Sequence, residues 1–410
     1  MVGAPYLSRC HPDCMMPEPT ATPTNTFSPD RTRTIAFVIA LLWAAAVIGA
    51  TVQQGIAHHN NNFLIFRAAS WHLLRGEDLY AAYPALHADY YKYSPTFALL
   101  FLPFALPPFW LAMLLWNTLN AAALYFAIGT VLPLRSANVA RAIVFLDMLG
   151  SLQNVQSNAL VAALIVVTFA AYERRHTVIG SAAAMVGAMI KIFPLAGVTF
   201  ALFHGRKVRV AVALILSGLV LAALPLLVTT PSTLRMQYVS WRALEAVDAM
   251  TRGFSVMEML HLLTRRDWPN WPIQLAGALL LVAPILVRHE RHREWGFRRL
   301  YLCSLLLFCL IFNHKAESPA FVIGVTGAAI WFAALERRSR WEWTLFGVIV
   351  VFTILASSDA MPRVLQRDLF DPYRLKVVPL IVLWVELQRK LWRTGGPADR
   401  RTVNRKGTPI

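Results

Sequence analysis

Hydrophobic residues in this chain gather into long blocks that are separated by short polar or basic segments. The first block covers residues 34–52 and contains no charged residue. A bilayer-spanning helix requires about 20 mostly apolar residues. We therefore expect an all-α polytopic membrane protein built as a bundle of about 11–13 transmembrane helices. The later blocks lie at residues 95–106, 108–132, 142–153, 157–172, 178–190, 193–204, 210–229, 272–287, 299–312, 318–335, 342–357 and 374–388.

Two long polar segments interrupt the blocks, at residues 53–93 and 230–271, and a shorter one lies at 358–373. The first contains the stretch FLIFRAASWHLLRGEDLY at residues 63–80, in which apolar residues recur at helical spacing. An amphipathic helix of this kind lies in the membrane interface rather than crossing the membrane. The sequence therefore predicts an interfacial helix within the first long segment.

Basic residues gather at the ends of the apolar blocks, and the formal net charge is +17. Basic runs at residues 173–176, 206–209, 288–299 and 336–340 are typical of the positive-inside rule, which places such runs on the cytoplasmic side. We therefore attribute the charge to membrane topology and expect the lipid bilayer, and no nucleic acid, as a partner.

This topology divides the chain into a disordered cytoplasmic tail (1–33), a transmembrane domain (34–390) and a basic cytoplasmic tail (391–410). The two long polar segments then form outer loops, and the expected location is the inner membrane of a bacterium. The blocks between residues 93 and 135 look like two crossings, although the charge pattern requires an odd number. One of them, or the short pair of blocks near Gln153, is therefore expected to be re-entrant.

The composition excludes a soluble protein, because 57% of the residues are apolar and only 15% are charged. Soluble domains have roughly 45–50% apolar and about 25% charged residues. The sequence contains no P-loop, dinucleotide-binding fingerprint or HExxH helix. Polar groups at membrane depth and in the outer loops are therefore the functional candidates.

The first outer loop supplies carboxylates and aromatic rings. Asp78 and Asp89 can act as a general base or hold a divalent ion, and Tyr93 offers a sugar a stacking face and a hydroxyl group. The alternative is a solvated loop with an interfacial aromatic belt. In the motif QNVQSN, Gln153 and Asn154 stand between two apolar blocks, where they either bind a polar ligand or cap helices in a turn.

Cationic residues near apolar blocks suggest a site for phosphate. Lys191, in GAMIKIFPLAG, either binds the phosphate of a lipid carrier or snorkels to the membrane surface. Arg374 stands at the start of the last block, and its planar guanidinium suits phosphate oxygens unless it pairs with Asp368 or Asp371.

The motif NHKAES interrupts the apolar sequence between residues 312 and 319. His314 and Glu317 suit acid–base chemistry, and Lys315 suits a phosphate. The alternative is a tight turn closed by an ion pair between Lys315 and Glu317. Five polar residues in one short turn favour a functional role.

Several motifs together resemble glycosyltransferase family 87. They are LLRGEDLY, YKYSPTFALLFLPFALPP, LWNTLNAAAL, QNVQSNALVAALIV and GAMIKIFPLAG, with a weaker continuation through NHKAESPAF and FDPYRLKVVP. The resemblance implies a GT-C-like fold with many transmembrane helices, a catalytic first outer loop and a polyprenyl-phosphate sugar as donor. It also implies transfer of a hexose, most often mannose, to a glycolipid or polysaccharide of the cell envelope. A divalent metal occurs in GT-C enzymes, but no ligand cluster in this sequence indicates one.

The family usually places a catalytic Asp shortly before an aromatic residue and an Ala-Ala pair in the first outer loop. The matching position here is Asn62, ahead of Phe66, Ala68 and Ala69. Because an amide cannot accept a proton as a carboxylate does, another carboxylate is expected to act as the base. The candidates for that base are Asp78, Asp89 and Glu317.

The remaining roles follow from the implied reaction. The residues expected to bind the departing lipid phosphate are Lys191, Lys315 and Arg374. Those expected to contact the sugar or the acceptor are Tyr93, Gln153, Asn154 and His314. The alternatives are a non-catalytic transporter or flippase for lipid-linked sugar or solute, and a pseudoenzyme, which the amide at Asn62 favours.

Overall fold

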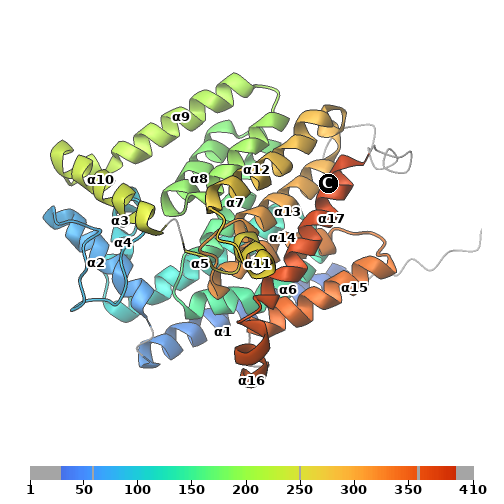
Figure 1. Cartoon of the computed structure of the whole chain (residues 1–410), viewed down its shortest axis with the longest axis horizontal. Helices are drawn as coiled ribbons and strands as arrows, with labels where there is room; N and C mark the ends of the chain where they lie inside the picture. The colour runs from blue at the N-terminus through green and yellow to red at the C-terminus, as the bar shows by residue number, and fades with distance from the viewer. Residues whose placement is uncertain (1–28, 58–59, 249–250, 358–360, 394–410) are drawn as a thin grey trace, which may run out of the picture.

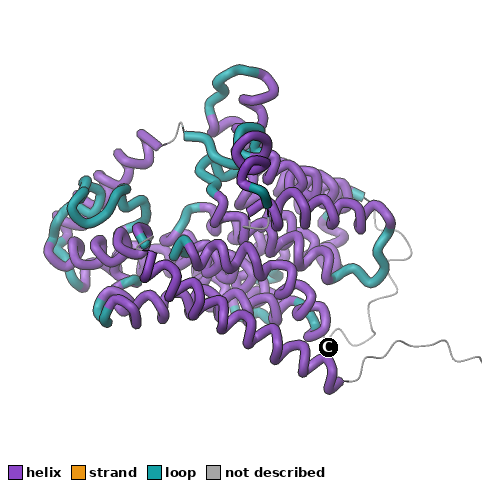
Figure 2. Tube along the Cα trace, turned by 90° about the horizontal axis from the view of Figure 1, so that it is seen from below, coloured by secondary structure: helices purple, strands orange, loops and turns teal. Residues whose placement is uncertain are grey.

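The computed structural model describes residues 29–57, 60–248, 251–357 and 361–393. This part of the chain is 80% helix and has no strands, which confirms the all-α membrane class (Figures 1 and 2). Among the described residues, four helices are long and apolar enough to cross a membrane, and the total of about 11–13 crossings stays a prediction. These four are α1 (Pro29–Ala57), α5 (Phe109–Val131), α9 (Lys207–Ala223, continued by η2, Leu224–Leu227) and α12 (Asn270–Val287).

The other helices are shorter. They are α2 (Asn61–Arg75), α3 (Pro95–Leu100), α4 (Leu102–Ala105), α6 (Leu134–Gln153), α7 (Asn158–Glu173), α8 (Thr177–Ile190), α10 (Pro231–Asp248), α11 (Val256–Thr264), α13 (Trp295–Ile311), α14 (Phe321–Ala333), α15 (Arg340–Ile349), α16 (Arg363–Leu365) and α17 (Val378–Trp392). Short 3₁₀ or π segments join or extend them: η1 (Phe193–Phe203), η3 (His289–Arg293), η4 (Ser318–Ala320), η5 (Val350–Ile354), η6 (Leu355–Ser357), η7 (Gln366–Phe370) and η8 (Leu375–Val377).

The bundle has two chemically different ends. At one end polar loops meet, and Gln153 of α6 donates to Gln53 of α1 at 2.8 Å. At the other end basic runs meet, and Arg298 of α13 forms a two-point ion pair with Glu173 of α7 at 2.7 and 2.8 Å. We call these the loop end and the basic end. The positive-inside rule makes the basic end the expected cytoplasmic side.

The core is formed by α5, α6, α7, α13 and α14, which pack side by side. Between α13 and α14 the approach is close, because a Cβ added at Gly327 would lie 2.8 Å from the carbonyl oxygen of Cys303. Small residues permit such close packing of membrane helices. The two helices therefore hold the turn between them, residues 312–317, at a fixed place at the loop end.

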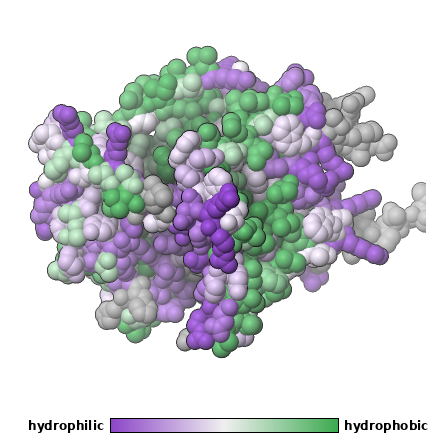
Figure 3. Space-filling model, viewed as in Figure 1, coloured by the Kyte–Doolittle hydropathy of each residue, from purple (hydrophilic) through white to green (hydrophobic). Residues whose placement is uncertain are grey.

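The outer helices present apolar side chains to the surroundings. Ile215 and Leu219 of α9 and Leu279 of α12 are each more than 60% exposed. Figure 3 shows hydrophobic residues gathered over α9. Exposed apolar surface of this extent is typical of helices that face lipid.

The first helix extends beyond the expected apolar block at both ends. The first helix begins at Pro29, ahead of residue 34, and it runs past residue 52 to Ala57. Residues 1–28 of the expected N-terminal tail and residues 394–410 of the expected C-terminal tail lie outside the described residues.

The expected crossing at residues 95–106 is broken into α3 and α4, which have six and four residues. At 1.5 Å per residue, neither can span a hydrocarbon core of about 30 Å. Ser94 caps α3 by accepting a hydrogen bond from the backbone N–H of Phe97. Only α5 is then long enough to cross between residues 93 and 135, which agrees with the odd number that the charges require.

The amphipathic helix expected in the first outer loop is confirmed over α2, which ends at Gly76 in the left-handed conformation (φ 70°). Its apolar face packs against α3 and α4 rather than lying open to an interface. Phe66 contacts Phe97 and Phe101 edge-to-face, with ring centres 5.3 and 5.4 Å apart. Figure 1 shows α2, α3, α4 and α10 gathered on the side of the molecule opposite the end of α17.

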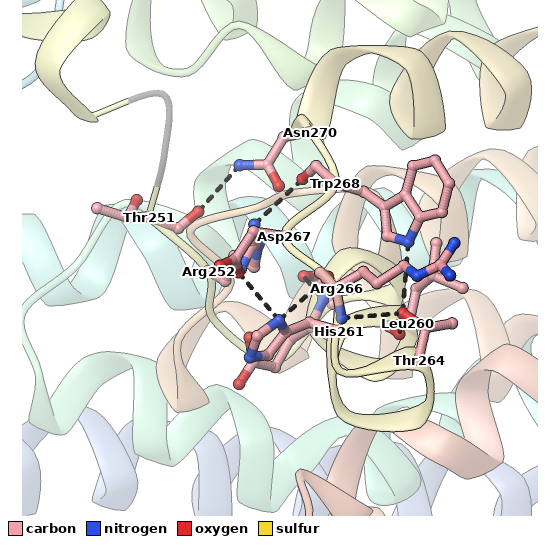
Figure 4. A network of polar contacts seen from close by, with 11 residues as sticks. Thr251, Arg252, Leu260, His261, Thr264, Arg266, Asp267, Trp268 and Asn270 are labelled. Carbon is pink, nitrogen blue, oxygen red and sulfur yellow. Dashed lines mark hydrogen bonds and ion pairs between the residues drawn. The ribbon is translucent and has the colours of Figure 1, made fainter.

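The segment expected to form the second outer loop is largely helical, since it contains α10 and α11. Residues 251–270 form a polar lobe around α11 (Figure 4), in which Arg252 donates to Asp267 at 2.7 Å. This hydrogen bond holds the pKa of Asp267 below its ordinary value. The lobe is bound to the turn between α13 and α14, because the backbone N–H of Phe254 donates to the carbonyl of Ala316 at 2.8 Å.

Candidate functional site

Lys191 lies at the loop end, where α8 stops. Its backbone is extended (φ −143°, ψ 139°), and Pro194 lies in the first turn of η1 shortly after it. The ammonium Nζ donates to Oδ1 of Asn158 at 2.6 Å and lies 6.0 Å from the centre of the Tyr93 ring. Two candidates far apart in the sequence, Lys191 and Tyr93, are therefore neighbours.

The turn between α6 and α7 provides the amides around Lys191. Val155 in this turn has φ 49°, a left-handed conformation that is strained for a β-branched residue. Trp116 of α5 supports it by donating to the Val155 carbonyl at 3.3 Å. After this reversal, Asn158 donates to Oε1 of Gln156 at 2.6 Å. Strain of this kind persists only where packing fixes the backbone, so the amides are held in place.

Glu317 joins this group from the turn between α13 and α14. Nε2 of Gln156 donates to its Oε2 at 3.3 Å. Lys191, Asn158, Gln156 and Glu317 thus form a continuous chain of hydrogen bonds. Burial raises the pKa of the Tyr93 hydroxyl, and the negative charge of Glu317 raises it further, so Tyr93 stays a neutral donor at neutral pH.

This arrangement combines the parts that a group transfer from a phosphate requires. The ammonium of Lys191 offers a fixed positive charge for an anionic leaving group, and the exposed carboxylate of Glu317 offers an acceptor for a proton. The amides of Gln156 and Asn158 are buried and fix the orientation of both ionic groups.

A comparison with protein families shows which family this chain belongs to. The profile of glycosyltransferase family 87 matches residues 91–312, which is more than half of the 410 residues. The chain belongs to glycosyltransferase family 87. Membership of this family implies transferase activity. Searches of curated proteins and of solved structures found no match.

The region matched by glycosyltransferase family 87 contains most of the hydrogen-bonded chain. Tyr93, Gln156, Asn158 and Lys191 lie inside it, whereas Glu317 follows its last residue. The resemblance drawn from the motifs is therefore confirmed at the level of the family. The roles of individual residues stay predictions.

Three predicted amide residues of this glycosyltransferase connect backbone segments around the site. Asn62 of α2 donates to the carbonyl of Asn154 at 2.9 Å, and the Asn154 side chain donates to the carbonyl of Gly150 at the end of α6. Gln153 bonds to Gln53 of α1. The structure thus places all three beside the turn of residues 153–158, where their amides hold helices together.

The two carboxylates predicted in the first outer loop lie apart from the chain of hydrogen bonds. Asp78 accepts from the backbone N–H of Tyr80 at 3.0 Å and from Ser240 of α10 at 3.2 Å. Asp89 is exposed and pairs with Lys92 at 3.1 Å. Asp78 therefore connects the loop to α10, and Asp89 is part of its surface.

The turn between α13 and α14 carries two further candidates, His314 and Lys315. Nδ1 of His314 lies 3.2 Å from Nε2 of Gln274 in α12. The backbone N–H of Lys315 donates to Oδ1 of Asn313 at 2.9 Å, which closes the turn. The turn thus presents Glu317 to α6 and α7 and His314 to α12.

Arg374 does not join Lys191, and the acidic side chain nearest to it is neither of the two aspartates offered as alternative partners. It has a left-handed backbone (φ 51°), and its Nε lies 3.9 Å from Oε1 of Glu258 in α11. The guanidinium also lies over the ring of Phe254, 5.0 Å from its centre. Asp368, one of the expected partners, pairs with Arg367 at 2.7 Å instead.

Sequence reasoning missed Asp147 of α6, which is only 4% exposed. Neither of its carboxylate oxygens has a hydrogen-bond partner among the described residues, and Lys376 is the cation that acts on it. Lys376 is also buried, and its Nζ donates to the hydroxyl of Ser318 at 3.1 Å, next to Glu317. The sequence did offer a signal for this residue, because Asp147 is a single acidic residue within an apolar block at membrane depth.

Metal binding stays untested by the structure. Within the described ranges, no group of three or more His, Cys, Asp or Glu side chains is placed to hold a metal ion.

Proposed function

We propose that this protein is a membrane hexosyltransferase that moves a sugar, mannose being the first choice, from a polyprenyl-phosphate donor to an envelope glycolipid or polysaccharide. The observation that supports the proposal is the chain from Lys191 through Asn158 and Gln156 to Glu317 at the loop end. Its expected location is the bacterial inner membrane, with the site on the outer side.

In the proposed reaction, Glu317 takes the proton from the acceptor hydroxyl while that oxygen bonds to the anomeric carbon of the donor sugar. The bond between this carbon and the phosphate oxygen breaks, and the electron pair leaves with the polyprenyl phosphate. The ammonium of Lys191 stabilises the negative charge that grows on the leaving phosphate. Tyr93 contacts the sugar, and Asn62 holds the turn at Asn154 rather than acting as a base.

The test uses the purified full chain with radiolabelled polyprenyl-phosphate mannose or glucose, and total envelope lipids as acceptor. Glu317→Gln should lower kcat by a factor on the order of 100 or more, because a general base contributes roughly 10²–10⁴-fold. Its affinity for the donor should change little. Asp78→Asn is the matched control, since Asp78 bonds to Ser240 away from the site.

If Glu317→Gln transfers sugar at the wild-type rate, Glu317 is not the base. If only Asp89→Asn loses activity, the base lies in the first outer loop. If the wild type binds the donor without transferring the sugar, the protein is a pseudoenzyme or carrier. If it neither binds nor transfers, the lipid-linked donor is wrong.

A further inference from the structure

A second polar site lies at the basic end, remote from Lys191 and Glu317. It is a cavity of about 480 Å³ between the turn that joins α7 to α8, the end of η1 and the first turns of α9 and α13. The helix α7 reaches from the candidate site at Asn158 to this cavity at Glu173. At 1.5 Å per residue the two sites are about 22 Å apart.

The cavity is lined by more basic than acidic side chains. Arg298 donates hydrogen bonds to the carboxylate of Glu173 at 2.7 and 2.8 Å and to the carbonyl of His292 at 2.7 Å. Arg175, Arg206 and Arg209 also line the cavity, and no ion pair in the described part of the chain involves them. Three guanidinium groups without a bound carboxylate suit the oxygens of a phosphate.

His204 adds a donor to this wall. Its side chain is only 9% exposed, and its Nδ1 accepts a hydrogen bond from the backbone N–H of Arg206 at 3.1 Å. Nε2 therefore carries the hydrogen of the neutral ring, and it has no hydrogen-bond partner among the described residues. Burial lowers the pKa of His204, and the charges of Arg175, Arg206 and Arg209 lower it further, so the ring is neutral and Nε2 is a donor.

The inner part of the cavity is aromatic. Phe169 of α7 and Phe200 of η1 line it, with ring centres 5.2 Å apart in an edge-to-face contact. A polar rim of arginines above aromatic rings matches an amphiphile whose phosphate lies at the membrane surface. The positive-inside rule places this rim at the cytoplasmic leaflet, where anionic headgroups attract arginines.

We propose that this cavity binds a phosphate group, carried by an anionic lipid headgroup of the leaflet at the basic end or by a soluble phosphate compound. The phosphate oxygens accept from Arg175, Arg206 and Arg209 and from Nε2 of His204. The site is independent of the proposed transfer reaction, because its residues neither contact nor bond to Lys191 or Glu317.

The experiment measures phosphatidylglycerol bound to the full chain in a phosphate-free detergent, by native mass spectrometry, with and without competing inorganic phosphate. The variant Arg206→Gln/Arg209→Gln removes two exposed charges of the rim. Each arginine contributes about 1 kcal/mol of binding free energy, so the loss of both weakens binding roughly 30-fold. Arg337→Gln/Arg340→Gln removes the same charge at the basic end outside the cavity and should change binding less than about twofold.

Phosphatidylglycerol binding that is lost in the cavity variant and kept in the control supports a lipid headgroup. Binding of inorganic phosphate alone, lost in the same variant, supports a soluble source. His204→Phe tests the donor without changing the charge and should also weaken binding. Equal losses in the cavity variant and the control, or no loss in either, would overturn the proposal. Donor binding and transfer at the loop end, measured on the same samples, show whether the proposed function fails separately.

Discussion

Replacing Asn158 by Asp is the sharpest test of Lys191 as a phosphate-binding residue. The carboxylate has the same size as the amide and still accepts from Nζ of Lys191, which lies 2.6 Å from Asn158. Lys191 therefore keeps its partner and its positive charge is neutralised, while the hydrogen bond that Asn158 donates to Oε1 of Gln156 is lost. A donor phosphate on the far side of the ammonium would lie about 5 Å from the new negative charge. At an effective dielectric constant of about 20, the repulsion is roughly 3 kcal/mol.

That repulsion corresponds to donor binding that is weaker by roughly 100-fold. The measurement is the donor Kd by equilibrium binding, together with the donor KM in the transfer assay. Asn138→Asp is the matched control, because Asn138 is a buried amide beside a cation, Arg141, at the basic end of the same bundle. A donor Kd for Asn158→Asp within threefold of the wild type would refute the assignment of Lys191.

Three further substitutions test how the site is supported. Gly253→Ala should lower the free energy of unfolding by about 1–3 kcal/mol, because its Cβ would clash with the backbone of the turn between α13 and α14. Gly296→Ala is the control, because its Cβ meets open space. Equal losses of stability for both variants in thermal unfolding would contradict this prediction. Ser94→Ala should cost about 1 kcal/mol as the cap of α3 and should release its 2.6 Å bond to the end of α8, lowering both the melting temperature and donor affinity. Lys376→Met leaves Asp147 without its cation and should lower the free energy of unfolding by about 3–5 kcal/mol. Adding Asp147→Asn should restore most of that stability. If it does not, the two groups are not coupled.

The fold class followed from the sequence because apolar blocks and basic runs are direct consequences of the bilayer. The amphipathic helix α2 was predicted from its periodicity. Its packing against α3 and α4 was not, because the periodicity of one helix does not encode its contacts with others. The segment at residues 95–106 was ambiguous, since its composition is that of a crossing helix. Its breaks after Leu100 and Ala105 are set by local packing and prolines.

The candidate site was predicted in part. Lys191 and Glu317 stood out because charged groups are rare beside apolar blocks. Their connection through Gln156 and Asn158 was not predictable, because it depends on the left-handed backbone at Val155. The sequence also grouped Arg374 with nearby aspartates, whereas its partner Glu258 comes from a distant helix.

The hydrogen bond between Gln156 and Glu317 joins residues that are 161 positions apart, and this separation has a consequence for biogenesis. At about 5–20 residues per second, the ribosome needs roughly 8–32 s to pass from one residue to the other. During that interval α7 and α8 emerge with Lys191 but without its counter-charge, so the nascent chain carries an uncompensated cation near the hydrocarbon. We therefore predict that chains that end before residue 313, which lack Glu317, are degraded faster than the full chain.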